Sequence, residues 1–161
     1  MTIWARGSAM AIVLDDEIKG LINAATVSGA PMILASVDAG GRPRLTFRGS
    51  LQAFSADQLG FWARNAEGST MANIAGNPNV AMIFRNSQTR VMLQLNGRAR
   101  VAEGAERDRV YDNAPDFERN ADPEKKGVGV IVDLDRVEGF LGMGADGKPR
   151  FVRQLRDQAS G

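Results

Sequence analysis

Short apolar segments separated by turn signals run through most of this chain, and they constrain its fold more than any other feature. Residues 32–38 end at Ala39-Gly40-Gly41, a turn sequence typical of β-hairpins. Asp146-Gly147 is a second such signal, near the end of the sequence. Six or seven segments are predicted to be strands, and they cover residues 32–38, 44–54, 59–64, 80–85, 90–101 and 128–134, with a last hairpin of 140–142 and 149–152. Consecutive hairpins predict an antiparallel sheet.

Residues 90–101 show the alternation of a half-buried strand most clearly. The set predicted to face the core is Val91, Leu93, Leu95, Ala99 and Val101. The set predicted to face solvent is Arg90, Met92, Gln94, Asn96, Arg98 and Arg100. A period of two with one polar face is typical of an antiparallel strand that covers a core on one side. We expect the three arginines to be solvated and to pair with Glu103, Glu106 or Asp108.

Short helices are predicted between the strands. Asp15-Asp16-Glu17, followed by apolar residues at helical spacing, predicts a helix that ends near Ser28-Gly29. Ser69 is predicted to cap a helix through about Gly76, because Pro78 cannot continue it. Further helical segments are predicted at 103–113 and, as a polar turn or loop, at 116–127. The fold class is therefore mainly β, an antiparallel barrel with short helices at its ends, whose closure removes exposed strand edges.

The 161 residues predict a single domain, without an internal repeat or a linker. We expect this domain to cover residues 10–156, with residues 1–9 an expression scar or disordered lead-in and residues 157–161 a tail. No apolar run approaches the roughly 20 residues that span a bilayer, and the first residues do not resemble a signal peptide. We therefore expect a cytoplasmic protein.

The absence of two residue types excludes several kinds of site. The chain contains no Cys and no His, so it has no disulfide, no Ser-His triad, and no Cys or His ligand for zinc or haem. No metal site is expected. Lys and Arg number 20 against 19 Asp and Glu, and this balance favours neither a nucleic-acid nor a membrane partner. If the protein performs redox chemistry, a cofactor has to supply the reactive group.

Residues 41–86 carry the strongest signal for a ligand. Arg48 lies within a predicted strand, Arg64 ends the next strand, and Ser69 and Thr70 open a predicted helix. A helix N-terminus offers free N–H groups and partial positive charge, so an anion is favoured there. Together these residues could surround a phosphate. Taken singly, Arg48 is more typical of a solvated or salt-bridged strand residue, and Ser69-Thr70 of an ordinary helix cap, a role that is compatible with phosphate binding.

The order of motifs in this stretch resembles a known family. Phe47-Arg48-Gly49, the aromatic pair Phe61-Trp62, and the pattern Ser-x-x-x-x-Ile-x-x-Asn-Pro-x-Val-Ala from Ser69 to Ala81 are similar to the pyridoxamine 5'-phosphate oxidase-like flavoproteins. The resemblance covers about residues 15–140 and includes Asn96–Val101 and Gly129–Gly139. It implies a split β-barrel, a homodimer that holds FMN non-covalently at the subunit interface, and a small-molecule substrate.

The resemblance also implies which residues bind the cofactor. Arg48 matches the basic strand residue that meets the FMN phosphate, and Ser69 and Thr70 match the phosphate-binding turn. Arg64 or Asn65 would lie beside the flavin ring or the phosphate. On the polar side of its strand, Gln94 is a candidate for contact with the isoalloxazine edge across the dimer. No catalytic residue and no metal ligand is implied.

Two departures from the family pattern bear on function. The turn that often reads Ser-Arg-Lys is Ser69-Thr70-Met71 here, with one or two cations fewer. The C-terminal Arg-Leu-His signature with which true pyridoxine-phosphate oxidases hold their substrate is absent. The expected function is therefore that of an FMN-binding oxidoreductase that does not form pyridoxal phosphate, with hydride or electron transfer through the flavin.

Three alternatives stay open. Relatives with the same barrel bind the deazaflavin cofactor F420, whose phosphate and acidic tail would suit Arg42, Arg44 and Arg64. A haem-handling relative would have only Met or Tyr111 to ligate iron. The protein could also be a flavin carrier or sensor without turnover, or bind nothing. Under every alternative we expect Phe61 and Trp62 to pack inside the barrel.

Overall fold

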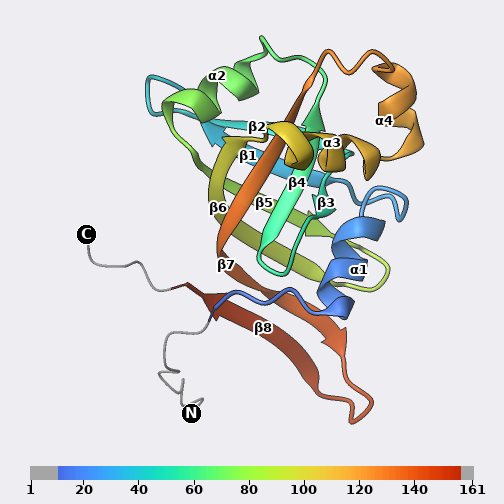
Figure 1. Ribbon diagram of the computed structural model, residues 1–161. Coiled ribbons are helices and arrows are strands. Elements are labelled where there is room, and N and C mark those ends of the chain that lie inside the picture. Colours follow the sequence, from blue (N-terminus) through green and yellow to red (C-terminus); the bar gives the residue numbers. More distant parts are fainter. Residues whose placement is uncertain (1–10, 157–161) are drawn as a thin grey trace.

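Eight antiparallel strands form one curled sheet in the computed structural model, which describes residues 11–156 (Figure 1). The predicted lead-in 1–9 and tail 157–161 lie outside the described residues. The helices are α1 (Asp16–Ala24), α2 (Ser69–Gly76), α3 (Gly104–Asp112) and α4 (Asp116–Ala121). The strands are β1 (Met32–Val37), β2 (Pro43–Arg48), β3 (Gln52–Ala53), β4 (Gln58–Ala63), β5 (Asn79–Arg85), β6 (Met92–Val101), β7 (Val128–Met143) and β8 (Pro149–Leu155). None of the helices described is long and apolar enough to cross a membrane.

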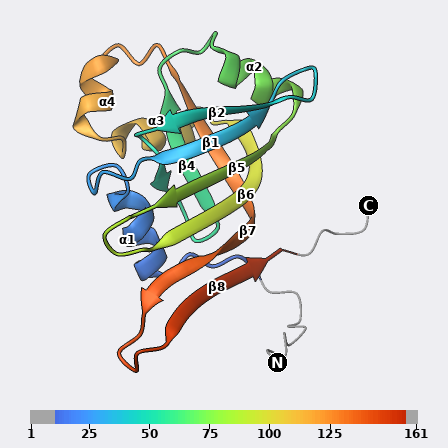
Figure 2. The ribbon, with the colours of Figure 1, turned by 180° about the vertical axis from the view of Figure 1, so that it is seen from behind.

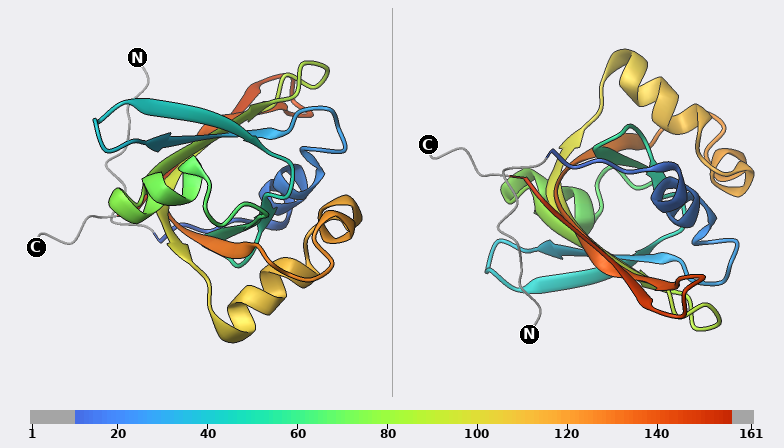
Figure 3. Two further views of the ribbon diagram at one scale, coloured as in Figure 1. Left: turned by 90° about the horizontal axis from the view of Figure 1, so that it is seen from above. Right: turned by 90° about the horizontal axis from the view of Figure 1, so that it is seen from below.

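The strand order β2-β1-β5-β6-β7-β4-β3 curls around a core, and β8 joins the far end of β7. Viewed from above and from below, the strands surround the core, α2 lies across one end of the barrel, and α3 and α4 lie outside the strands (Figure 3). The two outermost strands, β2 and β3, form no pairing with each other among the residues described; residues 49–51 join them through the chain instead. The expected mainly β split barrel is confirmed, although hydrogen bonding does not close it.

The long strand β7 divides the sheet into its two parts. Its first half pairs with β4 and its second half with β8, while β6 pairs along most of its other edge. The register shifts where Asn96 pairs with Arg136 and Gly97 with Leu134, so Asp135 is an extra residue in β7. A Cβ on Gly97 would lie 2.4 Å from the carbonyl oxygen of Asp133. Only glycine therefore permits this approach of β6 to β7.

Two apolar clusters lie on the two sides of β4 and β7. The larger fills the barrel and includes Leu59, Phe61 and Leu95. The smaller joins Trp62 and Ile131 to α3 and to the segments beside it, and the Trp62 ring meets the Tyr111 ring edge-on at 4.9 Å between centroids. Because it has a core on both faces, β4 is buried at every position from Leu59 to Ala63. Phe61 packs inside the barrel as predicted, whereas the prediction for Trp62 is wrong: this ring is buried on the opposite side of β4, against α3.

Several element boundaries differ from the prediction. The predicted strand 44–54 breaks at residues 49–51, and β2 pairs with β1 whereas β3 pairs with β4. Contacts from elsewhere cause the break: the hydroxyl of Thr26 donates to the carbonyl of Gly49, and Ser50 bonds the backbone of Trp62. Strand 128–134 continues to Met143. The first helix is shorter than predicted, since it ends at Ala24.

The alternation in β6 is confirmed at most positions. Val91, Leu93, Leu95 and Ala99 are buried as predicted. Val101 is wrongly assigned to the core: it is 47% exposed, at the last residue of the strand. Ala102 is buried instead, and its N–H donates to the carbonyl of Gly129 across the sheet.

Candidate functional site

A small pocket lies at the start of α2, where that helix approaches β2 and the end of β4. Its volume is about 200 Å³, and it is lined by Arg48, Ala63, Asn65, Gly68, Ser69, Thr70 and Met71. The sheet and the helix are fixed to each other nearby, because the amide of Asn73 donates a 3.0 Å hydrogen bond to the hydroxyl of Ser36 on β1. Four of the residues predicted to bind a cofactor line this pocket: Arg48, Asn65, Ser69 and Thr70.

The first turn of α2 presents unpaired backbone donors. The helix cap is Gly68 and not Ser69, so the predicted cap is wrong by one residue. A turn between Asn65 and Gly68 places the glycine at the cap position, with extended backbone angles. Gly68 has no side chain to accept a hydrogen bond, and no side-chain cap is present. The N–H groups that open the helix are thus left for another acceptor.

Arg48 connects the sheet to this helix start. Its Nη2 donates a 2.7 Å hydrogen bond to the hydroxyl of Thr70, and its guanidinium lies 5.2 Å from the ring centre of Phe61. The Nε of Arg48 is buried and has no acceptor within residues 11–156. Burial lowers the pKa of this guanidinium from its ordinary value, and the charge of Glu118 opposes that effect. A partly desolvated cation without a full partner favours an anion beside it.

Arg64 does not enter the pocket. Its Nε donates to the carboxylate of Glu118 on α4, at 2.7 Å, while Ala63 and Asn65 on either side of it line the pocket wall. The side chain of Asn65 accepts a hydrogen bond from the backbone of Glu67, which holds the turn before α2. Ser69 is exposed and Thr70 is buried. The predicted pair of arginines around one anion is therefore reduced to Arg48.

Gln94 lies on the other side of the sheet, at a surface that we call the outer face. Cross-strand pairing places Phe47, Ile33, Ile83 and Gln94 in one row across β2, β1, β5 and β6, and the next row contains Met92, Phe140 and Phe151. These strands lie side by side in Figure 2. The face is apolar for a surface: Leu45, Phe47, Ile83, Met92, Phe151 and Leu155 are all exposed on it. A hollow of about 420 Å³ beside Gln94 is lined by Met92, Phe140 and Phe151 among others.

The comparisons with known proteins agree with this geometry. A family model described as Pyridoxamine 5'-phosphate oxidase matches residues 14–133. The chain belongs to this family. No curated protein sequence matches the chain.

Solved structures with low sequence identity share the family fold. HupZ from Group A Streptococcus is 23% identical, with a TM-score of 0.60, over 82% of this chain and 97% of its own. A pyridoxamine 5'-phosphate oxidase-related, FMN-binding protein from Nostoc punctiforme is 13% identical, with a TM-score of 0.64, over 89% and 98%. A haem-binding protein from Mycobacterium smegmatis is 17% identical, with a TM-score of 0.60, over 89% and 60%. Proteins with this fold thus include one described as FMN-binding and one described as haem-binding.

Sequence reasoning missed Glu118, which is 6% exposed although it lies in the polar segment 116–127. A run of charged residues with few apolar ones reads as a solvated face, and nothing in its spacing shows that Arg64 and Glu118 meet. The one available signal is general: arginines at a phosphate site need counter-charges, so acidic residues in the neighbouring helix are candidates for them.

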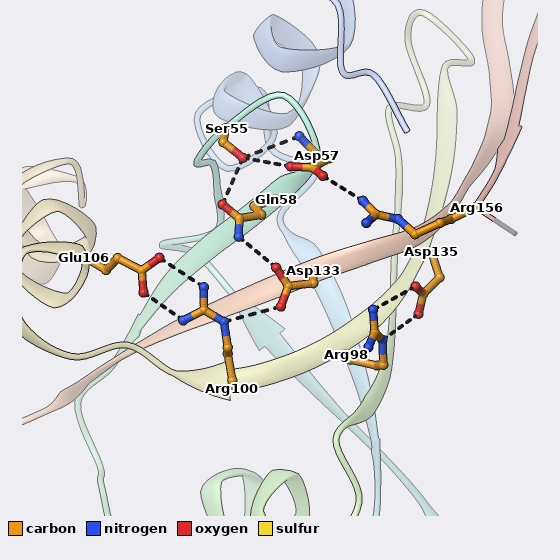
Figure 4. A network of polar contacts seen from close by, with 9 residues as sticks. All are labelled: Ser55, Asp57, Gln58, Arg98, Arg100, Glu106, Asp133, Asp135 and Arg156. Carbon is orange, nitrogen blue, oxygen red and sulfur yellow. Dashed lines mark hydrogen bonds and ion pairs between the residues drawn. The ribbon is translucent and has the colours of Figure 1, made fainter. Parts of the chain in front are cut away.

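Two arginines of β6, Arg98 and Arg100, form ion pairs with acidic residues of β7 and α3 (Figure 4). Arg100 forms a two-point contact with Glu106, at 2.7 and 3.0 Å, which confirms one predicted pairing, and it also reaches Asp133. Arg98 pairs with Asp135, the extra residue of β7, instead of an acid of α3. The hydrogen bonds that Arg100 donates to Glu106 raise the pKa of Arg100, as do the charges of Asp133 and Glu106. These pairs satisfy one another and leave no arginine of this network to hold a ligand.

Proposed function

We propose that this member of the pyridoxamine 5'-phosphate oxidase family binds FMN through its phosphate at the start of α2 and acts as a flavin-dependent oxidoreductase. The observation that carries the proposal is Arg48: a partly buried guanidinium beside unpaired helix N–H groups, without an ion pair to any carboxylate in the part of the chain described. A phosphate would accept from Arg48, from the N–H groups and from the hydroxyl of Ser69. Charge-assisted hydrogen bonds contribute roughly 1.5–3 kcal/mol each, so two or three would hold it.

The volume of the pocket suits the phosphate of FMN, and the isoalloxazine ring would then lie outside the pocket. Pockets that enclose a whole small molecule measure roughly 300–1,000 Å³, whereas this one measures about 200 Å³. The rest of an FMN molecule therefore has to lie beyond the pocket. In this proposal a second copy of the chain covers it, with the apolar outer face as the dimer interface. Gln94 belongs to that face, so contact with the flavin would come from the second copy.

A bound flavin supplies hydride or electron transfer at its N5 atom, and the chain supplies position and charge. No acid or base for the reaction is assigned. The hydroxyl of Tyr111, the only tyrosine, shares its single proton between the backbone carbonyls of Arg119 and Asp122, at 3.2 and 3.0 Å. Because these hydrogen bonds hold the hydroxyl of Tyr111 in the protein interior, Tyr111 is disfavoured both as an acid or base and as a haem ligand. Protons would come from substrate or water. The cytoplasmic location stays a prediction.

The test is the visible absorption spectrum of the purified protein, recorded before and after incubation with FMN and gel filtration. We expect a flavin spectrum that elutes with the protein, and no retention of riboflavin, which lacks the phosphate. Retention of F420 alone would move the function to the deazaflavin alternative. A bound flavin that no donor or acceptor reduces or oxidises would identify a carrier. A protein that retains no flavin of either kind would contradict the proposal.

A further inference from the structure

Glu118 is a buried carboxylate that the proposed function does not use. It lies on α4, and its carboxylate accepts a 2.7 Å bond from the Nε of Arg64. The two side chains differ in depth: that of Glu118 is 8% exposed, and that of Arg64 is 57% exposed. Removing a carboxylate from water carries a large free-energy cost, and a partner that is itself half in solvent offsets only part of it. Because the burial of Glu118 costs folding free energy that Arg64 does not fully offset, we expect a role of Glu118 in function.

Glu118 acts on both arginines of the pocket region. Ala63 and Asn65, the chain neighbours of Arg64, line the pocket, while the side chain of Arg64 pairs with Glu118. The negative charge of Glu118 also acts on Arg48 inside the pocket. It raises the pKa of Arg48, whereas burial lowers that pKa. The carboxylate of Glu118 thus partly neutralises the charge of Arg48 inside the pocket. It also binds the side chain of Arg64 outside the pocket.

We propose that Glu118 sets the affinity of the α2 pocket for a phosphate-bearing ligand, by offsetting the charge of Arg48 and keeping Arg64 out of the pocket. The identity of the ligand rests on the proposed function. A phosphate at the helix start gains from Arg48 and from the N–H groups, but it is repelled by Glu118. The turn is also short of cations, with Thr70 and Met71 after Ser69.

The size of the effect follows from Coulomb's law. If the phosphate and Glu118 are treated as unit charges at an assumed separation of roughly 10 Å, with an effective dielectric constant of about 20, the charge of Glu118 changes the binding constant by roughly tenfold. Removing the charge of Glu118 should therefore tighten phosphate binding about tenfold, and more if Arg64 then turns into the pocket. A ligand without a phosphate should be unaffected.

The experiment compares FMN and riboflavin on Glu118→Gln, which keeps the shape of the side chain and removes its charge. Flavin fluorescence is titrated against the full chain, with Glu124→Gln as the matched control. Glu124 has the same chemistry just beyond α4, but its side chain is 67% exposed. We expect Glu118→Gln to lower the Kd for FMN roughly tenfold and to leave riboflavin unchanged, and Glu124→Gln to change neither. An equal Kd for FMN, or an equal shift for both ligands, would overturn the proposal.

A double variant, Arg64→Gln with Glu118→Gln, separates the two parts of the proposal and serves if the single variant does not fold. It should bind FMN more tightly than wild type but less tightly than Glu118→Gln, because Arg64 is no longer there to turn inward. A gain as large as that of the single variant would contradict the role given to Arg64. If neither the wild type nor any variant binds FMN, the proposed function fails. The same proteins are then titrated with inorganic phosphate. Equal affinities of wild type and Glu118→Gln for phosphate would overturn the role of Glu118 independently of the proposed function.

Discussion

The side chain of Arg48 at the end of β2 donates a 2.7 Å hydrogen bond to the hydroxyl of Thr70 in the first turn of α2. The two residues are 22 positions apart, and their contact holds the cation of the sheet against the open end of the helix. The same hydroxyl that was predicted to meet a phosphate therefore first positions the arginine. The guanidinium of Arg48 and the hydroxyl of Thr70 are thus oriented before a phosphate binds, which reduces the entropy lost on binding.

The first prediction concerns Arg48→Ala. We expect FMN binding to weaken by about one to two powers of ten, because a charge-assisted hydrogen bond is lost from a partly desolvated site. Arg44→Ala is the matched control, since Arg44 lies on the same strand but is exposed and outside the pocket. Fluorescence titration of both variants with FMN gives the comparison. An unchanged Kd in Arg48→Ala would remove the phosphate role from this residue.

The second prediction concerns Asp122, which anchors the turn after α4 to β4. Its carboxylate accepts hydrogen bonds from the indole of Trp62 and from the backbone N–H groups of Lys126 and Gly127, at 2.8–2.9 Å. Asp122→Asn places an amide donor among these donors, so we expect the free energy of unfolding to fall by about 1–3 kcal/mol at neutral pH. Urea denaturation followed by circular dichroism measures this loss.

The pH dependence of that loss follows from the pKa of Asp122. Burial raises this pKa, but the hydrogen bonds from Gly127, Lys126 and Trp62 and the charge of Lys126 outweigh burial, so the pKa in the folded state is lowered. A lowered pKa means that ionised Asp122 contributes stability above its unfolded value, near 4, and loses it as the pH falls through the folded value. The difference between wild type and Asp122→Asn should therefore shrink in acid. A constant difference from pH 7 to pH 2 would contradict this assignment.

Local patterns were sufficient to predict much of the fold. The Ala39-Gly40-Gly41 turn, the alternation of β6 and the helix before Asn77-Pro78 each depend on neighbouring residues, and each is found in the structure. The break of the predicted strand 44–54 was not predictable in this way. It depends on Thr26 and Trp62, which reach residues 49–50 from distant parts of the chain.

The candidate site was predictable to a similar extent. Arg48, Asn65, Ser69 and Thr70 meet as expected because they are carried by a strand, a turn and a helix that follow one another. The direction of Arg64 was not predictable, since it depends on Glu118, 54 positions later in a polar segment (118 − 64 = 54). Gln94 was correctly placed on the side of β6 away from the core, but only the cross-strand register shows which residues accompany it.

The third prediction contrasts two glycines. Gly97→Ala should be strongly destabilising, because its Cβ would lie 2.4 Å from the backbone oxygen of Asp133. Overpacking typically costs about 1–3 kcal/mol, and a clash with backbone belongs at the upper end of that range. Gly20→Ala is the control: it lies inside α1 with nothing within 4 Å of the new methyl group, and alanine in a helix should add about 0.5–1 kcal/mol. Thermal melts should therefore move in opposite directions, and parallel shifts would contradict the proposed role of the β6–β7 approach.

The fourth prediction concerns the outer face as the surface that a second copy covers. Phe47 is 70% exposed at one end of an apolar row, so the isolated chain gains little stability from it. An aromatic side chain that becomes buried in an interface as an anchor contributes about 2 kcal/mol or more. Phe47→Lys should therefore weaken the dimer roughly thirtyfold or more, while the melting temperature of the monomer changes little. Analytical ultracentrifugation over a range of concentrations measures the dissociation constant.

The matched control for this surface is Val27→Lys, because Val27 is 88% exposed, follows α1 and lies on no strand of the outer face. It should leave the dimer intact. Since the proposed FMN site is completed by the second copy, Phe47→Lys should also release FMN as the protein is diluted, whereas Val27→Lys should not. A monomeric wild type that still retains FMN would show that one chain encloses the cofactor alone, and the outer face would then have no part in binding it.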